Sequence, residues 1–203
     1  MALVNPSSLT FEDIRLILCV HGYALENQFV CREIGYWSRN GSGVIPFSCR
    51  VNPNKLNSKD RITVRYLTKN FHGIDIKKQI EIGLLQNEIR SVIRTLYSMA
   101  DDDNNRKYIG ICRDINVFTL CCSSGFQYLT INLENMNNIS SELRVPTNDD
   151  LLNLMENKYN PYKICKIHNY LDNGKPVLCA GTKAKFLADY FIKSISELNK
   201  NIK

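Results

Sequence analysis

The chain has 203 residues, of which 44% are hydrophobic and 23% charged, with a net charge of +6 and an isoelectric point near 8.9. Such a chain can bury a sizeable core by itself, which excludes a small scaffold held by disulfides. The mild positive charge permits contact with nucleic acid without requiring it. No stretch approaches the ~18 apolar residues that span a bilayer, so we expect no membrane partner.

Three strands are expected first, after a short polar lead-in at residues 1–10. Residues 14–23 are continuously apolar, which is typical of a central buried strand. Residues 29–37 mix β-branched, aromatic and charged side chains and predict a second strand. The Arg-Asn-Gly-Ser-Gly run at 39–43 predicts a hairpin turn, and residues 44–51 return as the third strand.

The rest of the chain alternates between helices and strands. After a basic segment at 52–79, which we expect to be irregular, apolar residues recur at helical spacing from 80 to 99. Further elements are expected at residues 107–112 (strand), 114–122 (helix, N-capped near Arg113 or Asp114), 126–133 (strand), 149–157 (helix) and 177–198 (helix).

This order predicts an α/β fold with a single domain over residues 1–203. The sheet is expected to be mixed and five-stranded, with three antiparallel strands followed by two parallel ones, and to be flanked by helices. No internal repeat or linker divides the chain.

Several short motifs carry a resemblance when they are taken in order. They are His21-Gly22-Tyr23, Cys31-Arg32-Glu33-Ile34, Tyr66-Leu67, Phe71-His72-Gly73-Ile74, residues 108–122, Asn132-Leu133-Glu134, Cys165-x-x-His168 and Cys179-Ala180-x-x-Lys183-Ala184. Over residues 14–195 the chain resembles the ribonuclease H-like fold in its DEDDh exonuclease branch, in the degenerate form found in insects and insect viruses. The resemblance implies a ribonuclease H-like sheet.

The resemblance also implies where catalytic acids would lie. Active DEDDh enzymes hold two divalent metals through converging carboxylates. Here the first-strand positions are Cys19 and His21, and Lys183 stands where the last aspartate belongs, while Asp114 lies near the middle position. A thiol and an imidazole do not replace hard oxygen ligands, and an ammonium repels metals. We therefore expect no enzyme, no catalytic residues, no cofactor and no metal.

The sequence gives only weak signals for other kinds of site. Cys165 and His168 form one Cys-x-x-His unit without a second pair to complete a zinc site. The acidic run at 101–103 lacks the ligand spacing of a calcium loop. Cys19 and His21 share a strand face and form a conceivable nucleophilic pair, but such a pair on a buried strand more often packs.

With catalysis set aside, we expect a structural protein that assembles with itself. Eight cysteines without a metal pattern suggest intermolecular disulfides, for which the candidates are Cys31, Cys49, Cys121 and Cys122. Together with the resemblance to insect-virus sequences, this favours a viral occlusion-body (polyhedrin-like) matrix protein. Its partners would be its own copies and virions. The first apolar run follows acidic residues rather than a basic leader, so we expect an intracellular protein, in the nucleus or cytoplasm of an infected cell.

The alternative is an inactive exonuclease-like protein that still binds nucleic acid. Single strands are bound by cations interleaved with aromatic rings. The segment that comes nearest to this pattern supplies Arg61, Arg65, Tyr66, Lys69, Phe71, Lys77 and Lys78.

Overall fold

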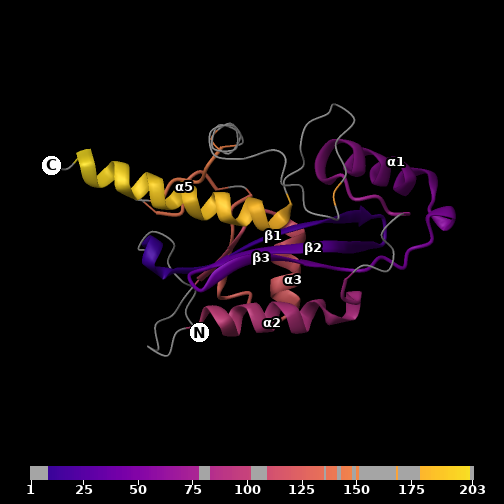
Figure 1. The fold of residues 1–203 in the computed structure, drawn as a ribbon, viewed down its shortest axis with the longest axis horizontal. Helices are drawn as coiled ribbons and strands as arrows, with labels where there is room; N and C mark the ends of the chain where they lie inside the picture. The colour runs from indigo at the N-terminus through magenta and orange to yellow at the C-terminus, as the bar shows by residue number, and fades with distance from the viewer. Residues whose placement is uncertain are drawn as a thin grey trace.

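Figure 1 shows the computed structural model of the chain. The described residues are 9–77, 83–101, 109–134, 136–140, 143–147, 150, 168 and 179–201, with the side chains of the last helix described as far as residue 193. The predicted helix at 149–157 lies outside these ranges except for its second residue, and Lys78 and Cys165 lie outside them altogether.

A five-stranded mixed sheet forms the centre of the fold. Its strands are β1 (Ile14–Leu25), β2 (Gln28–Ser38), β3 (Gly41–Pro46), β4 (Ile109–Cys112) and β5 (Thr130–Asn132), in the order β3-β2-β1-β4-β5. The β1–β2 and β2–β3 pairs are antiparallel, whereas β1–β4 and β4–β5 are parallel. The predicted sheet, with three antiparallel strands followed by two parallel ones, is confirmed.

Helices cover both faces of this sheet (Figure 1). On one face lies α5 (Ala180–Asn201), and on the other lie α2 (Ile89–Ala100) and α3 (Ile115–Ser123). Successive β1 residues alternate between the two layers: Ile17 packs on the α5 side, and Leu18 packs on the side of α2 and α3. A continuously apolar β1 is therefore what a strand buried on both faces requires.

The segment at 52–79 is not irregular throughout, because it contains a helix that the sequence pattern did not predict. This helix, α1 (Ser58–Leu67), continues into a short π-helical turn, η4 (Thr68–His72). The Asn57 side chain caps α1 by accepting a hydrogen bond from the Asp60 backbone N–H at 2.8 Å. Since α1 buries only Asp60 and Val64, it lacks the apolar stripe that identifies a helix in sequence.

Replacing Asn57 by alanine is expected to lower the free energy of unfolding by about 1 kcal/mol, because the cap of α1 is lost. Urea denaturation measures the change. The control is Lys59→Ala, an exposed position in the first turn of the same helix. Equal stability of the Asn57→Ala and Lys59→Ala variants would contradict the capping role.

The helix predicted from residue 80 begins only at Ile89, after a short 3-10 turn at Gln86–Glu88. Leu84 precedes the turn in an extended segment, where its N–H donates to Pro46 and its carbonyl accepts from the Ser48 N–H. These backbone contacts hold the segment against the end of β3, so it cannot continue the helix. Leu85, which fits the helical spacing, is partly exposed.

Candidate functional site: a buried Lys–His–Glu–His network

Strand pairing brings together residues that the resemblance places at a lost active site. Cys19 and His21 lie two residues apart on β1, so both face α5. The register of β1 and β2 places Glu33 directly opposite His21. Both side chains are buried, with 6% of His21 and none of Glu33 exposed.

Glycines let the start of α5 approach the sheet closely. A Cβ on Gly35 of β2 would lie 1.9 Å from the carbonyl carbon of Ala180, and one on Gly181 would lie 2.6 Å from the carbonyl oxygen of Gly43. Only residues without side chains fit at these contacts. The approach lets the Ala180 N–H donate to Glu33 Oε1 at 2.7 Å and places Lys183 beside His21.

Four side chains then form one network, which we call the buried network: Lys183, His21, Glu33 and His168. Lys183 Nζ donates to His21 Nε2 at 2.7 Å. His21 Nδ1 lies 2.8 Å from Glu33 Oε1, at an angle poor for a hydrogen bond. His168 Nε2 lies 3.0 Å from Glu33 Oε2, and its Nδ1 bonds to the His72 carbonyl. Because both nitrogens of His168 face acceptors, that ring is suited to carry a charge.

The protonation states follow from burial and from these contacts. Burial would raise the pKa of Glu33, but the hydrogen bond from His168 and the close contact with His21 outweigh it and hold that pKa well below its usual value. Burial would lower the pKa of His168, but Glu33 raises it further, so the net shift is upward. Burial and the Lys183 charge lower the pKa of His21 to about 4, so His21 is neutral at pH 7. Burial also lowers the pKa of Lys183.

The residues of the network do not fit the two divalent metals that the resemblance implies. Such metals need several carboxylates, whereas the network contributes one, Glu33, which already faces three nitrogens: His21 Nδ1, His168 Nε2 and the Ala180 N–H. The Lys183 amine bonds to the outer nitrogen of His21, where a metal ligand would be needed. The network therefore does not support a metal-dependent step.

A single soft metal is the other possibility that the donors raise. Potential ligand atoms of His21, Glu33 and His168 lie within 4.8 Å of one another, the only such group among the residues that the structure describes. A zinc ion there would have to displace the protons that both imidazoles present to Glu33, beside a buried cation. The hydrogen bond from His168 and the close contact of His21 Nδ1 already use both oxygens of Glu33.

Cys19 and Asp114, at or near the remaining positions where the resemblance expects metal-binding acids, have other roles. Burial raises the pKa of Cys19 to about 12, so its thiol stays protonated and is not a nucleophile toward which His21 could act as a base. Asp114 is the predicted N-cap of α3 and accepts from the Asn116 N–H at 2.6 Å. Its charge also acts on Lys183, raising the pKa that burial lowers.

His72 joins the network through its backbone. Its Nδ1 accepts from the Ile74 N–H at 3.1 Å, so its proton lies on Nε2, for which the described residues offer no hydrogen-bond partner. Burial lowers the pKa of His72 to about 3, which keeps the ring neutral. His72 therefore acts as a support that ties η4 to His168.

The cysteines proposed to cross-link copies are mostly inaccessible. Cys31, Cys49 and Cys121 are fully buried, and Cys122 is partly exposed. All the thiols in the described ranges are free. Disulfides between folded copies through the three buried thiols would require the core to open, so that expectation is corrected for these three.

Five of the predicted nucleic-acid residues lie on one surface together with Ile62, which was not predicted. We call this surface the α1 face: Arg61, Ile62, Arg65, Tyr66, Lys69 and Phe71. All six are exposed on α1 and η4. Lys77 is exposed farther along the chain, after η4.

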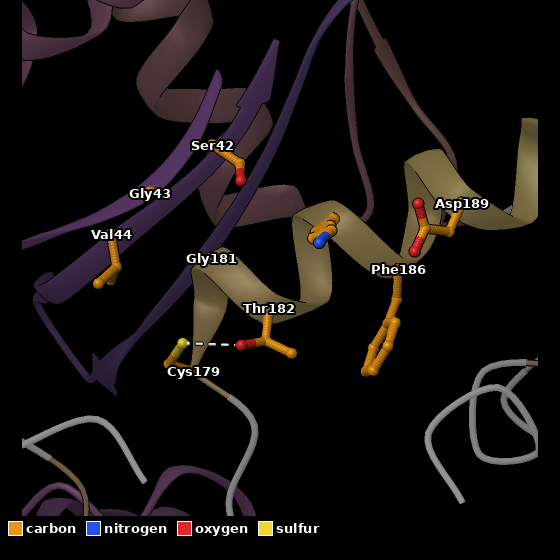
Figure 2. Close-up of a pocket in the computed structure, with 9 residues that line it drawn as sticks. Ser42, Gly43, Val44, Cys179, Gly181, Thr182, Phe186 and Asp189 are labelled. Carbon is orange, nitrogen blue, oxygen red and sulfur yellow. Dashed lines mark hydrogen bonds between the residues drawn. The ribbon is translucent and has the colours of Figure 1, made fainter. Parts of the chain in front are cut away.

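A separate groove of about 500 Å³ lies beside the start of α5 (Figure 2). It is lined by Ser42, Gly43, Val44, Cys179, Gly181, Thr182, Lys185, Phe186 and Asp189. The Cys179 thiol lies 3.1 Å from the Thr182 hydroxyl, which is not a base that could activate it. The groove is therefore a cavity whose lining residues do not form an activated nucleophile.

Comparison with protein-family models and with curated proteins finds no match to the chain. Within the described ranges, no helix combines the length and the apolar character that crossing a membrane requires.

Proposed function

We propose that the protein is a non-enzymatic structural protein that assembles with its own copies on a catalytically inactive, exonuclease-like fold. One observation carries the proposal. At the positions where the resemblance places metal-binding acids, Lys183 bonds to a neutral His21, and both belong to the buried network. A cation fixed there opposes metal binding, and the buried Cys19 thiol supplies no substitute chemistry.

Assembly is supported by large apolar side chains exposed on opposite faces of the sheet. On the side of α2 and α3, Met99 and Ile115 are 48% and 52% exposed. On the other side, Ile192 of α5 is 47% exposed. A lattice needs contacts on several sides of each copy, whereas a closed dimer needs one. We propose a dense matrix of the occlusion-body type as the form that this assembly takes.

The test is self-association of the purified chain under reducing conditions. We expect particles whose size grows with concentration in light scattering, and we expect Ile115→Glu to raise the concentration needed at least tenfold, because it charges an apolar contact. The matched control is Thr119→Glu, which adds the same charge one turn along the exposed side of α3. A chain that stays monomeric at all concentrations, or equal effects of the two variants, would remove the assembly proposal.

A separate experiment tests whether the protein lacks nuclease activity. Labelled oligonucleotides incubated with the protein and Mg²⁺ or Mn²⁺ are expected to remain intact. Any hydrolysis is to be repeated with Glu33→Gln, which removes the only carboxylate of the buried network. Degradation that disappears in this variant while the variant remains folded would show that the protein is a nuclease after all.

A further inference from the structure

We propose that the α1 face binds single-stranded nucleic acid. Arg61 and Arg65 are one helical turn apart, and Lys69 continues the same line into η4. These three exposed cations form a row that can follow a phosphate backbone. The Arg61 Nε donates to the Leu56 carbonyl at 2.8 Å, which holds the first cation of the row in place.

A second row of apolar side chains runs beside the cations. Ile62 is 70% exposed, Tyr66 55% and Phe71 49%. The rings of Tyr66 and Phe71 lie 5.4 Å apart between centroids and are tilted by 60°. Exposed rings next to cations provide stacking surfaces for unpaired bases, and this combination is typical of proteins that bind single strands. Bases in a duplex are already stacked on one another, so a single strand fits this face better.

The charge of the α1 face is not cancelled within α1. The only acidic residue of the helix, Asp60, is turned inward and 8% exposed. Its Oδ1 accepts from the Glu26 N–H at 2.9 Å, and its Oδ2 accepts from the Asn57 side chain at 3.2 Å. Because the charged side chains that define the face are all basic, pairing it with the same face of a second copy would bring like charges together. Phosphate is the complementary occupant.

Among the described residues, α1 packs against the rest of the protein through the side opposite this face. Figure 1 shows α1 at one end of the sheet, on the same side as α5, whose C-terminal part lies toward the other end. Val64, on the inner side of α1, packs into a small core with Tyr23 and Val30 of the β1–β2 hairpin. The rows of the α1 face therefore project from a helix that is anchored on its other side.

Fluorescence anisotropy with labelled oligo(dT) and oligo(U) of about 16 nucleotides tests the proposal. We expect binding to both at low salt, weaker binding to a duplex of the same length, and no competition from inorganic phosphate at the same phosphate concentration. Tyr66→Leu with Phe71→Leu is expected to raise Kd about tenfold, because the stacking surface is lost while apolar bulk remains. Arg65→Gln with Lys69→Gln is expected to lower the slope of log Kd against log salt by about 1.4.

The matched controls change the same residue types elsewhere. Arg90→Gln alters an exposed cation of α2, and Tyr128→Leu removes a ring that is 45% exposed after α3. Neither control is expected to change Kd by more than about twofold. Absence of binding at low salt, tighter binding to the duplex, or controls that act as strongly as the α1 variants would overturn the proposal. So would an α1 variant that abolishes self-association and leaves oligonucleotide binding intact. The proposal does not depend on assembly, so the two can fail separately.

Discussion

Replacing Glu33 by glutamine is expected to lower the free energy of unfolding by about 3–5 kcal/mol. Glu33 is fully buried and is the carboxylate that faces His21, His168 and the N–H of Ala180. Glutamine keeps the size of the side chain but removes the negative charge. The His168 imidazolium and the Lys183 amine would then be buried without their counter-ion, which is the costly case for a buried charge.

Urea denaturation at pH 7.5 measures the loss of stability in Glu33→Gln. The pKa values of the histidines show whether the missing negative charge causes it. In Glu33→Gln the pKa of His168 should fall, because the carboxylate that raises it is gone. Histidine proton resonances followed by NMR would report this shift. The matched control is Glu12→Gln, which removes an exposed carboxylate 3.0 Å from Arg39 and should cost less than about 1 kcal/mol. A Glu33→Gln variant as stable as Glu12→Gln would show that the buried network does not hold the fold together.

Much of the fold could be predicted because it depends on local patterns. The apolar run of β1, the turn after Ser38 and the cap at Asp114 each act within a few residues. The exception is α1, whose exposed face carries Ile62 and Tyr66 and therefore lacks the contrast between faces that a periodicity search needs. The only local signal was its cap, Asn57 followed three residues later by Asp60.

The buried network could be predicted only in part. The resemblance pointed to Cys19, His21 and Lys183, and the structure places Lys183 against His21. Glu33 and His168 belong to the motifs that carry the resemblance, but nothing in their sequence positions indicates that they join the site. They are 135 positions apart and meet only through tertiary packing. A glutamate inside an otherwise apolar strand was the available signal, since such a charge is seldom buried without partners.

The protein is expected to be most stable near neutral pH and to lose stability on either side. On the acid side, His21 and His72 have pKa values lowered to about 4 and about 3, from an ordinary value of 6.5. The unfolded chain therefore binds more protons as pH falls below 6.5, and stability is lost through that range. Glu33, with its lowered pKa, adds to the loss below about 4.5. His168 does not contribute in this range, because its pKa is raised: its stabilising effect is complete below pH 6.5 and is lost as pH rises through the folded value.

The alkaline side should be steeper, because more groups act together. Burial raises the pKa of Cys19 and Tyr23 to about 12 and that of Cys121 to about 11, from ordinary values of 9.0 for thiols and 10.0 for tyrosine. The same cause raises the pKa of three other buried groups, Cys31, Cys112 and Tyr97. Their stabilising effect is complete below pH 9 and is lost as pH rises toward the folded values. Four thiols together cost about 5 kcal/mol per pH unit, so unfolding is expected by about pH 11.

Adjacent cysteines provide a matched pair of variants for this prediction. Cys121 is fully buried, whereas Cys122 is partly exposed. Removing an ionisable buried thiol by Cys121→Ala should make the alkaline loss of stability shallower by about a quarter, whereas Cys122→Ala should leave the slope nearly unchanged. Urea midpoints measured from pH 5 to 11 in the presence of reductant follow the loss of stability on the acid side and on the alkaline side. Any matrix of copies should dissolve over the same alkaline range. Constant stability up to pH 11, or equal slopes for the two variants, would show that buried thiols do not limit the fold.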